Sequence, residues 1–146
     1  TDGPASSNDL DVLGATRLAA LLHKGAPWSG SPDAASLPAE VSLHAATLGG
    51  ARALGVDADL GSLEVGKLAD LVAVDLDRPH VQPVYDVASS VLYAGGRGDV
   101  TDVWGEGRRA VAAGRVTATA AATVTDDLRD LRRVVDDLRG GDGAPA

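Results

Sequence analysis

The sequence predicts a mixed fold of class α/β plus β, in which a helical first part precedes a strand-rich middle and an amphipathic terminal helix. Three observations support this order. Leucines recur every three or four residues near the N-terminus, short valine-rich runs occupy the middle, and a leucine–valine stripe marks the last helix. The helical and extended periodicities do not overlap, which indicates separate helical and strand-bearing parts.

Two helices account for the first part of the chain. From Asn8 onward, the leucine spacing predicts a helix that ends near Gly25. A second helix is expected to begin with Ser36 as N-cap and Pro38 in its first turn, and to end at Gly55. Its buried stripe is predicted at Val41, Ala45, Leu48 and Ala51. The glycine pair 49–50 inside it suggests that another backbone approaches closely there.

After Gly55 the pattern changes from helical to extended. Gly66 fits the third position of a type II turn, which requires a positive φ angle. The short apolar run 71–74 predicts a strand covered on both faces. Further strand-like or mixed segments are expected at 87–94, 100–104 and 108–111, the last two joined by a hairpin turn.

The last element is predicted to be an amphipathic helix from about residue 125 to residue 139. Its apolar face is expected at Leu128, Leu131, Val135 and Leu138. Asp126 and Asp127 lie near the expected N-terminus, where the helix dipole favours negative charge. The glycines at 140 and 141 end the helix.

Composition excludes several classes of function. The 146 residues carry a formal net charge of -8 and only 3% aromatic residues, whereas a nucleic-acid surface needs basic grooves and stacking rings. The absence of cysteine excludes disulfides, thiolate nucleophiles and cysteine-based zinc sites. No apolar run approaches the roughly 20 residues of a membrane helix. We therefore expect a cytoplasmic protein that binds neither nucleic acid nor membrane.

Methionine is also absent from the chain. We therefore expect that position 1 is not a translation start and that the sequence is a piece of a longer protein.

The histidines are isolated in the sequence and form no metal-binding pair. His23 is expected in the last turn of its helix, where the helix dipole stabilises a partial positive charge. His44 is expected to be a packed or surface residue, and His80 to anchor its loop by a hydrogen bond. Asp2, taken alone in its Thr-Asp-Gly-Pro context, is typical of an Asx turn before a helix.

A series of motifs follows in order along the chain. They are TDGPASSNDLD at 1–11, RLAALLHKG at 17–25, ATLGGARALG at 46–55, GSLEVGKLADLV at 61–72, DRPH at 77–80, PVYD at 83–86 and VTDVW at 100–104. Together they cover about residues 1–117. This series resembles the amidohydrolase superfamily, and within it the aminohydrolase branch that contains methylthioadenosine/S-adenosylhomocysteine deaminases and triazine- and chlorohydrolase-like enzymes.

The resemblance implies a metal-dependent hydrolase on a (β/α)₈ TIM barrel with an appended composite β-sandwich domain. This chain would form the C-terminal end of that fold. The expected parts are the end of the last barrel strand with its loop and helices at 1–55, the C-terminal part of the β-sandwich at 56–122, the amphipathic terminal helix at 123–140 and a disordered tail at 141–146.

The same resemblance implies that Asp2 ends the eighth strand, binds the metal and shuttles protons. The metal would be Zn²⁺ or another divalent ion such as Fe²⁺, which lowers the pKa of its bound water toward neutrality. Ser6 and Asn8 match the family's pattern and are expected near the substrate, whereas Ser7 and Val65 replace a usual asparagine and proline. The family's other metal ligands have no counterpart here, so the chain alone is expected to be inactive and to bind no metal tightly.

The implied activity of the parent is hydrolysis of a carbon–nitrogen bond other than a peptide bond. Deamination of a methylthioadenosine/S-adenosylhomocysteine-type purine nucleoside fits best. The expected binding partner is therefore the substrate, a small heterocyclic amine or nucleoside. Assembly into a homo-oligomer is left open as a further alternative. A chlorohydrolase or a guanine-type deaminase is the alternative within the superfamily. The alternative from another class is a non-catalytic module whose β-domain and terminal helix serve assembly.

Overall fold

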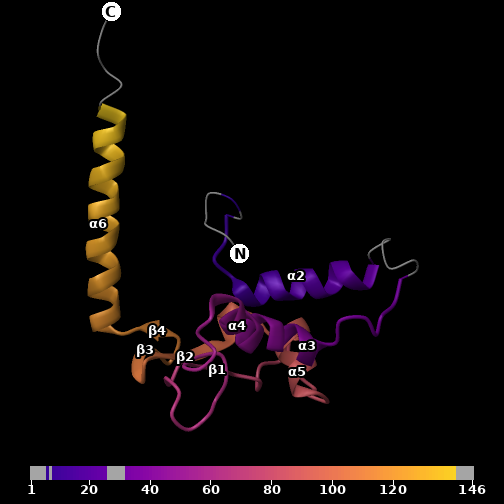
Figure 1. Ribbon diagram of the computed structural model, residues 1–146. Coiled ribbons are helices and arrows are strands. Elements are labelled where there is room, and N and C mark those ends of the chain that lie inside the picture. Colours follow the sequence, from indigo (N-terminus) through magenta and orange to yellow (C-terminus); the bar gives the residue numbers. More distant parts are fainter. Residues whose placement is uncertain (1–5, 7, 26–31, 141–146) are drawn as a thin grey trace, which may run out of the picture.

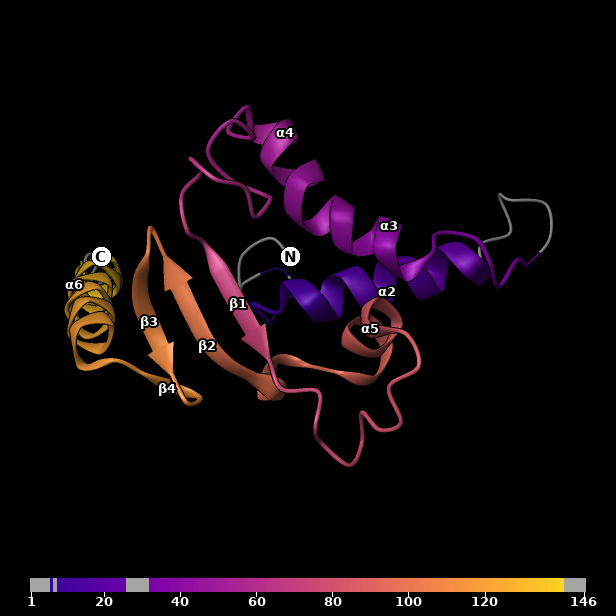
Figure 2. The ribbon, with the colours of Figure 1, turned by 90° about the horizontal axis from the view of Figure 1, so that it is seen from below.

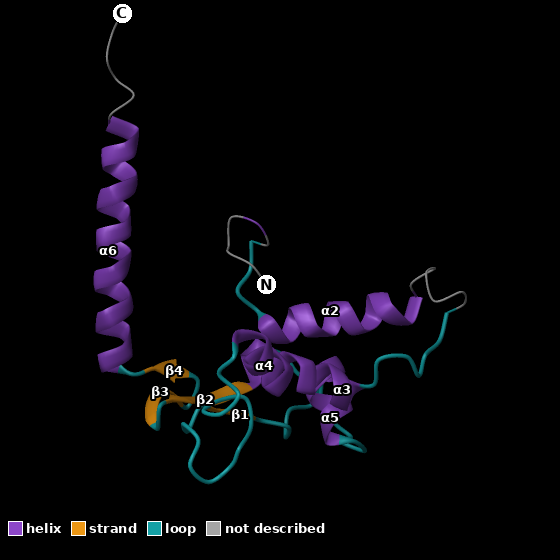
Figure 3. Cartoon of the chain, viewed as in Figure 1, coloured by secondary structure: helices purple, strands orange, loops and turns teal. Residues whose placement is uncertain are grey.

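The computed structural model describes residues 6, 8–25 and 32–140. Helices form the first part of the chain, a small antiparallel sheet follows, and a long helix comes last (Figures 1 and 3). The expected order of helices, strands and a terminal helix is therefore confirmed, except that the helical segment 87–94 lies between the first two strands. Within the described ranges, no helix is long and apolar enough to cross a membrane.

Helix α2 (Val12–Gly25) begins at a carboxylate cap. The backbone N–H of Gly14 donates to Asp11 Oδ1 at 2.9 Å, which satisfies a donor that the first helical turn leaves free. A Cβ on Gly14 would lie 3.0 Å from Asp11 Oδ2, so the close neighbour of this glycine is the capping side chain. His23 lies in the last turn of α2, as predicted.

The second helix comprises α3 (Ala39–His44), the π-helical stretch η2 (Ala45–Gly49) and α4 (Gly50–Leu54). Its N-cap is Pro38 and not Ser36, because Leu37 takes a positive φ of 49° and turns the chain immediately before the proline. Gly55 ends the helix in the left-handed conformation with φ 70°, as predicted.

The buried stripe predicted for this helix is wrong in its first half. Val41 is 51% exposed and Ala45 is exposed, whereas Ser42 is buried and its hydroxyl donates to Pro38 O at 3.1 Å. The π-helical turn adds a residue per turn and so rotates the face that follows. As a result Ala51 is buried as predicted, but it does not continue a face that begins at Val41.

The close backbone approach predicted at the glycine pair 49–50 occurs instead at Gly61. A Cβ on Gly49 would meet atoms of its own helix, the nearest being His44 O at 3.3 Å. A Cβ on Gly61 would lie 2.7 Å from Ala51 Cβ and 2.8 Å from Leu48 Cα. The segment that leads into the sheet therefore packs directly against the second helix at this glycine.

The turn at Gly66 has the predicted geometry. Gly66 has φ 98°, and the N–H of Lys67 donates to Glu64 O at 3.2 Å. The Lys67 ammonium joins this turn to the residues before it, because it donates to Asp57 O at 2.6 Å and to Ser62 Oγ at 2.7 Å.

Four strands form an antiparallel meander, and Figure 2 shows β1 nearest the helices and β3 nearest the last helix. The strands are β1 (Leu71–Val74), β2 (Val100–Gly105), β3 (Arg108–Ala112) and β4 (Arg115–Val116). Glu106 and Gly107 both have positive φ, as a type I′ hairpin requires, which confirms the predicted turn. The prediction that β1 is covered on both faces is wrong for this chain, because Val72 is 61% exposed.

The segment predicted as strand-like or mixed at 87–94 is helical. It consists of α5 (Val87–Ser89) and the π-helical η3 (Ser90–Ala94), and a 3₁₀ turn η4 (Arg97–Asp99) leads into β2. The N–H of Ser89 donates to Asp86 Oδ2 at 2.6 Å. This N-cap outweighs the strand preference of the valines.

The described core lies where α2, α3 and η3 meet. Ala20 and Leu92 are fully buried there, and Ala39 is nearly so. Around them pack the partly buried side chains of Leu13, Leu37, Leu43, Ala88 and Tyr93.

Helix α6 (Ala118–Gly140) begins earlier than predicted. The N–H of Ala121 donates to Thr117 O at 2.8 Å, and Thr117 itself donates to Ala110 O in β3. Asp126 and Asp127 consequently lie inside the helix and not at its N-terminus. Leu128 and Leu131, which belong to the predicted apolar face, are more than half exposed.

Candidate functional site

The segment that contains the predicted site residues lies immediately before α2. Asp2 lies outside the described residues, while Ser6 and Asn8 are described and both are exposed. Asn8 has φ 58°, a left-handed conformation that asparagine tolerates better than most residues. The chain therefore bends at Asn8 just before it enters the helix.

Two acidic residues connect this segment to the rest of the molecule. Asp9 accepts a hydrogen bond from the Arg97 guanidinium and another from the N–H of Leu10. Asp11 caps α2 through the N–H of Gly14. The stretch between the bend and the helix is thus held both to its own helix and to the turn before β2.

Arg17 fixes α2 against the end of η3. Its Nε donates to Leu92 O at 2.6 Å, and its Nη2 donates to Gly95 O. These carbonyls belong to a helix end, where backbone oxygens lack partners within the helix, and the planar guanidinium can reach both at once. Arg17 and Asp9 together position residues 9–17 relative to residues 92–97.

A groove of about 470 Å³ runs along α2. Asp9 and Asp11 lie at one end, and Leu18 and Leu22, which are 58% and 59% exposed, line the other. This helix face can accept an apolar partner along its leucines, with the two carboxylates at the end nearest Asn8.

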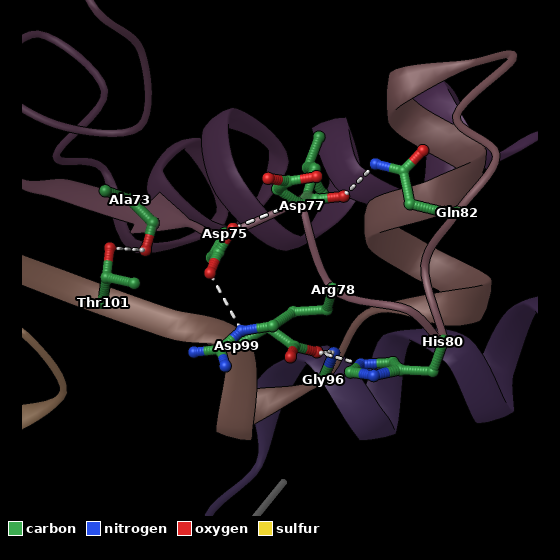
Figure 4. Close-up of polar contacts among 10 residues, drawn as sticks. Ala73, Asp75, Asp77, Arg78, His80, Gln82, Gly96, Asp99 and Thr101 are labelled. Atoms are coloured by element: carbon green, nitrogen blue, oxygen red, sulfur yellow. Dashed lines mark hydrogen bonds and ion pairs between the residues drawn. The ribbon is translucent and has the colours of Figure 1, made fainter.

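A second polar cluster lies beside β2 (Figure 4). His80 Nε2 lies 3.0 Å from Asp99 Oδ2, and the N–H of Gly96 donates to the same oxygen at 2.9 Å. The Asp99 carbonyl accepts from the N–H of Asp75, whose carboxylate pairs with Arg78 at 2.8 Å. The cluster closes the loop between β1 and α5, which confirms the predicted anchoring role of His80.

The hydrogen bond from His80 lowers the pKa of Asp99 below its usual value. Burial, which leaves Asp99 only 6% exposed, acts in the opposite direction, and the Gly96 N–H adds a smaller lowering. Three other carboxyl groups also have a lowered pKa, Glu64 mainly through Ser62, Asp86 through Ser89 and Asp102 through Arg109. A general acid or base needs a pKa near the working pH, so these groups serve as ion-pair and turn partners.

The described residues do not by themselves form a metal site. Across 8–25 and 32–140, no group of three histidine, aspartate or glutamate side chains could hold a metal ion. The candidate ligand that remains is Asp2, outside those ranges.

The family model described as the amidohydrolase family matches residues 1–110. The chain belongs to the amidohydrolase family. A 5-methylthioadenosine/S-adenosylhomocysteine deaminase of Moorella thermoacetica is 44% identical over 124 residues, which cover 85% of this chain and 28% of that protein. A protein of the same name from Natronomonas pharaonis is 50% identical over 108 residues, which cover 73% of this chain and 24% of that protein.

Solved structures agree with this family. An adenosine deaminase from Xanthomonas campestris with bound zinc has a TM-score of 0.75 and 43% identity, covering 92% of this chain and 30% of that one. An atrazine chlorohydrolase from Arthrobacter aurescens TC1, complexed with zinc, has a TM-score of 0.70 and 30% identity, covering 88% and 28%. The amidohydrolase chain described here thus spans less than a third of the length of these relatives.

Family and structural neighbours together imply a TIM-barrel hydrolase, of which these helices and this antiparallel sheet make up a part. Sequence reasoning missed the contacts that hold the candidate segment in place. No neighbouring residue in the sequence indicates that Arg17 joins α2 to η3, because the carbonyl groups that accept its hydrogen bonds lie 75 and 78 positions further along the chain. The one available signal was an arginine placed among the apolar residues of an otherwise leucine-lined helix.

Proposed function

We propose that this amidohydrolase chain is the C-terminal part of a metal-dependent hydrolase that deaminates purine nucleosides of the methylthioadenosine/S-adenosylhomocysteine type. The observation that carries the proposal is 44% identity, over 85% of the chain, to a protein named as such a deaminase. The adenosine deaminase among the structural neighbours supports the same reaction. We place the enzyme in the cytoplasm.

Within this proposal, residues 1–55 contain the end of the last barrel strand, its loop and its helices. Residues 56–122 contribute to a composite β-sandwich, 123–140 form a terminal helix, and 141–146 are a tail. The packing of Gly61 against the second helix supports a direct junction between the first two parts.

Asp2 is the proposed catalytic residue and metal ligand. In the reaction, a water oxygen bonds to the ring carbon that carries the amino group, and the bond from that carbon to nitrogen breaks. A carboxylate at position 2 accepts a proton from the water and transfers it to the nitrogen, which leaves as ammonia. The hydrogen bonds of Asp9 and Arg17 support this proposal, because they fix residues 9–17, which follow the Asp2 motif in the sequence, against Arg97 and Leu92.

Ser6 and Asn8 are proposed to lie near the substrate. Both side chains are exposed, and a hydroxyl and an amide can each donate and accept hydrogen bonds to a heterocycle.

The described residues do not fit a metal ion on their own. Zinc is bound in the adenosine deaminase and chlorohydrolase structures, and we propose Zn²⁺, or Fe²⁺, for the parent enzyme. Ligands other than Asp2 would come from outside these 146 residues. The isolated chain should therefore retain clearly less than one equivalent of zinc after dialysis, and a stoichiometric content measured by metal analysis would contradict this.

A chimera tests the proposed function. Residues 1–146 replace the matching C-terminal part of the Moorella deaminase, and ammonia release is measured with 5-methylthioadenosine and S-adenosylhomocysteine. We expect activity, and a loss of about 10²–10⁴-fold in kcat for Asp2→Asn, as is typical when a proton-transfer group is removed. The matched control is Glu40→Gln, an exposed carboxylate in the first turn of α3, which should leave the rate unchanged.

A second candidate function is hydrolytic dechlorination of a triazine, favoured by the chlorohydrolase neighbour. Chloride release from atrazine, with ammonia release absent, would favour it. A guanine-type deaminase would be favoured by ammonia release from guanine alone. A folded chimera that hydrolyses none of these compounds would support the non-catalytic assembly module.

A further inference from the structure

Among the residues that the structure describes, Asp99 is the one charged residue that is buried, with 6% of its surface exposed. It is the last residue of η4, immediately before β2. Removing a carboxylate from water costs free energy, so a buried carboxylate is kept where neighbouring groups hydrogen-bond to it. The partners of Asp99 therefore show which part of the fold depends on this side chain.

One oxygen of Asp99 fixes the turn at residues 96–99. Asp99 Oδ2 accepts the N–H of Gly96 at 2.9 Å and lies 3.0 Å from His80 Nε2 (Figure 4). The backbone closes the same turn, because the N–H of Asp99 donates to Gly96 O at 2.9 Å. The Asp99 carbonyl accepts the N–H of Asp75 at 2.8 Å, which joins the turn to the residue after β1. The turn cannot change its backbone conformation without breaking hydrogen bonds of a buried group.

The guanidinium of Arg97 connects this turn to the segment before α2. Its Nη1 donates to Asp9 Oδ1, and the same oxygen accepts the N–H of Leu10 at 2.9 Å. Arg97 thus joins the backbone at residues 9 and 10 to a turn that lies 88 positions further along the chain. The place of Arg97 depends on Asp99, because Gly96 and Asp99, on either side of Arg97, are fixed to each other.

Asn8 is the residue next to this contact. It is exposed and has φ 58°, and a planar peptide bond joins it to Asp9. Fixing Asp9 therefore restricts the positions that Asn8 can take. A side chain that is already held in its binding position loses less conformational entropy when a ligand binds, and this preorganisation increases affinity.

We propose that Asp99 is a positioning residue: it fixes the turn 96–99, which holds Arg97 against Asp9 and so orients Asn8 for substrate binding. Asp99 does not touch the substrate and acts through Arg97. The inference rests on the proposed deaminase function, because the substrate contact of Asn8 belongs to that proposal. Loss of Asp99 should weaken substrate binding without changing the chemical step, which raises KM and leaves kcat unchanged.

The complete 146-residue chain tests the connection between the turn and Asp9. Urea unfolding of the unmodified chain, Asp9→Ala, Arg97→Ala and the double variant gives the coupling between these two residues. We expect a coupling of about two- to fivefold in the unfolding equilibrium constant, as for an exposed ion pair. The same cycle in an Asp99→Ala background should show no coupling. Absence of coupling in the unmodified chain, or equal coupling in both backgrounds, would overturn the proposal.

The chimera with the Moorella deaminase tests the effect on substrate binding. Asp99→Ala and Arg97→Ala should each raise KM for 5-methylthioadenosine about two- to fivefold and change kcat by less than about 1.5-fold. The double variant should raise KM no further, because both changes remove the same contact. Asp99→Asn should restore the unmodified KM, since an amide oxygen can accept the same two hydrogen bonds. The matched control is Arg108→Ala, at an exposed arginine that pairs with Glu106 in the β2–β3 hairpin, and it should change neither constant.

A purely structural role of Asp99 would give a different result. Loss of folded enzyme lowers the apparent kcat and leaves KM unchanged. That result, additive effects in the double variant, or an Asn variant as impaired as the Ala variant would overturn the positioning role. A folded unmodified chimera without deaminase activity would overturn the deaminase proposal and this one with it, whereas an active chimera whose KM does not respond would overturn this one alone.

Discussion

Replacement of Gly61 by alanine should destabilise the junction between the helical part and the sheet. Gly61 has φ 89°, and its added Cβ would lie 2.7 Å from Ala51 Cβ and 2.8 Å from Leu48 Cα. Neither neighbour is the flexible end of a side chain, so the two segments must move apart. The variant therefore suffers both backbone strain and a steric clash.

Gly66 separates these two effects. It has φ 98°, yet a Cβ there would meet nothing within 4 Å. Gly66→Ala should lower the free energy of unfolding by about 1–2 kcal/mol from backbone strain alone. Gly61→Ala adds an overpacking penalty of about 1–3 kcal/mol, for a total loss of about 2–5 kcal/mol.

Urea unfolding followed by circular dichroism measures these differences through the midpoint and slope of the transition. Gly98→Ala is the neutral control, because Gly98 lacks a positive φ and has open space around its Cβ position, and it should change stability by less than about 0.5 kcal/mol. If Gly61→Ala and Gly66→Ala lower the free energy of unfolding equally, then the close approach of Gly61 to the second helix adds no overpacking penalty. That result would contradict the prediction.

Two further predictions concern the core and the buried carboxylate. Leu92→Ala should cost about 2–5 kcal/mol because Leu92 is fully buried, whereas Val87→Ala, at a side chain 60% exposed, should cost less than about 0.5 kcal/mol; urea unfolding that ranks them equally would contradict the assigned core. For Asp99, the hydrogen bond from His80 lowers the pKa in the folded chain, so the stability that it contributes is present above the unfolded pKa of about 4 and is lost as pH falls through the lower folded value. Urea midpoints at pH 5 and pH 3 should therefore fall further for the unmodified chain than for Asp99→Asn, and an equal fall would refute the link.

Local patterns in the sequence correctly predicted the features that local physics decides. Gly55 and Gly66 adopt the positive φ angles that their turns require, and the hairpin at residues 105–107 forms as predicted. The errors arose where neighbours in space compete with local preference. Residues 87–94 contain two valines and a tyrosine, which favour a strand, yet the Asp86 cap and the burial of Leu92 make the segment helical.

The candidate site shows the same division. The series of motifs that begins around Asp2, Ser6 and Asn8 predicted the family from the sequence, and the family model covers residues 1–110. The contacts that hold the segment, from Asp9 to Arg97 and from Arg17 to the end of η3, join residues 75 to 88 positions apart. Nothing in the local sequence around Arg17 indicates which carbonyls it will bind.

The sequence by itself determined the family of this protein, the order of its helices, strands and terminal helix, and the amphipathic pattern of that last helix. Those properties depend on residue identity and on periodicity along one element, which the sequence contains in full. The tertiary structure alone decided that Gly61, and not the glycine pair 49–50, is the point of close approach, and that Leu128 and Leu131 of α6 are exposed. Packing depends on which distant segments meet, and that is a property of the folded chain as a whole.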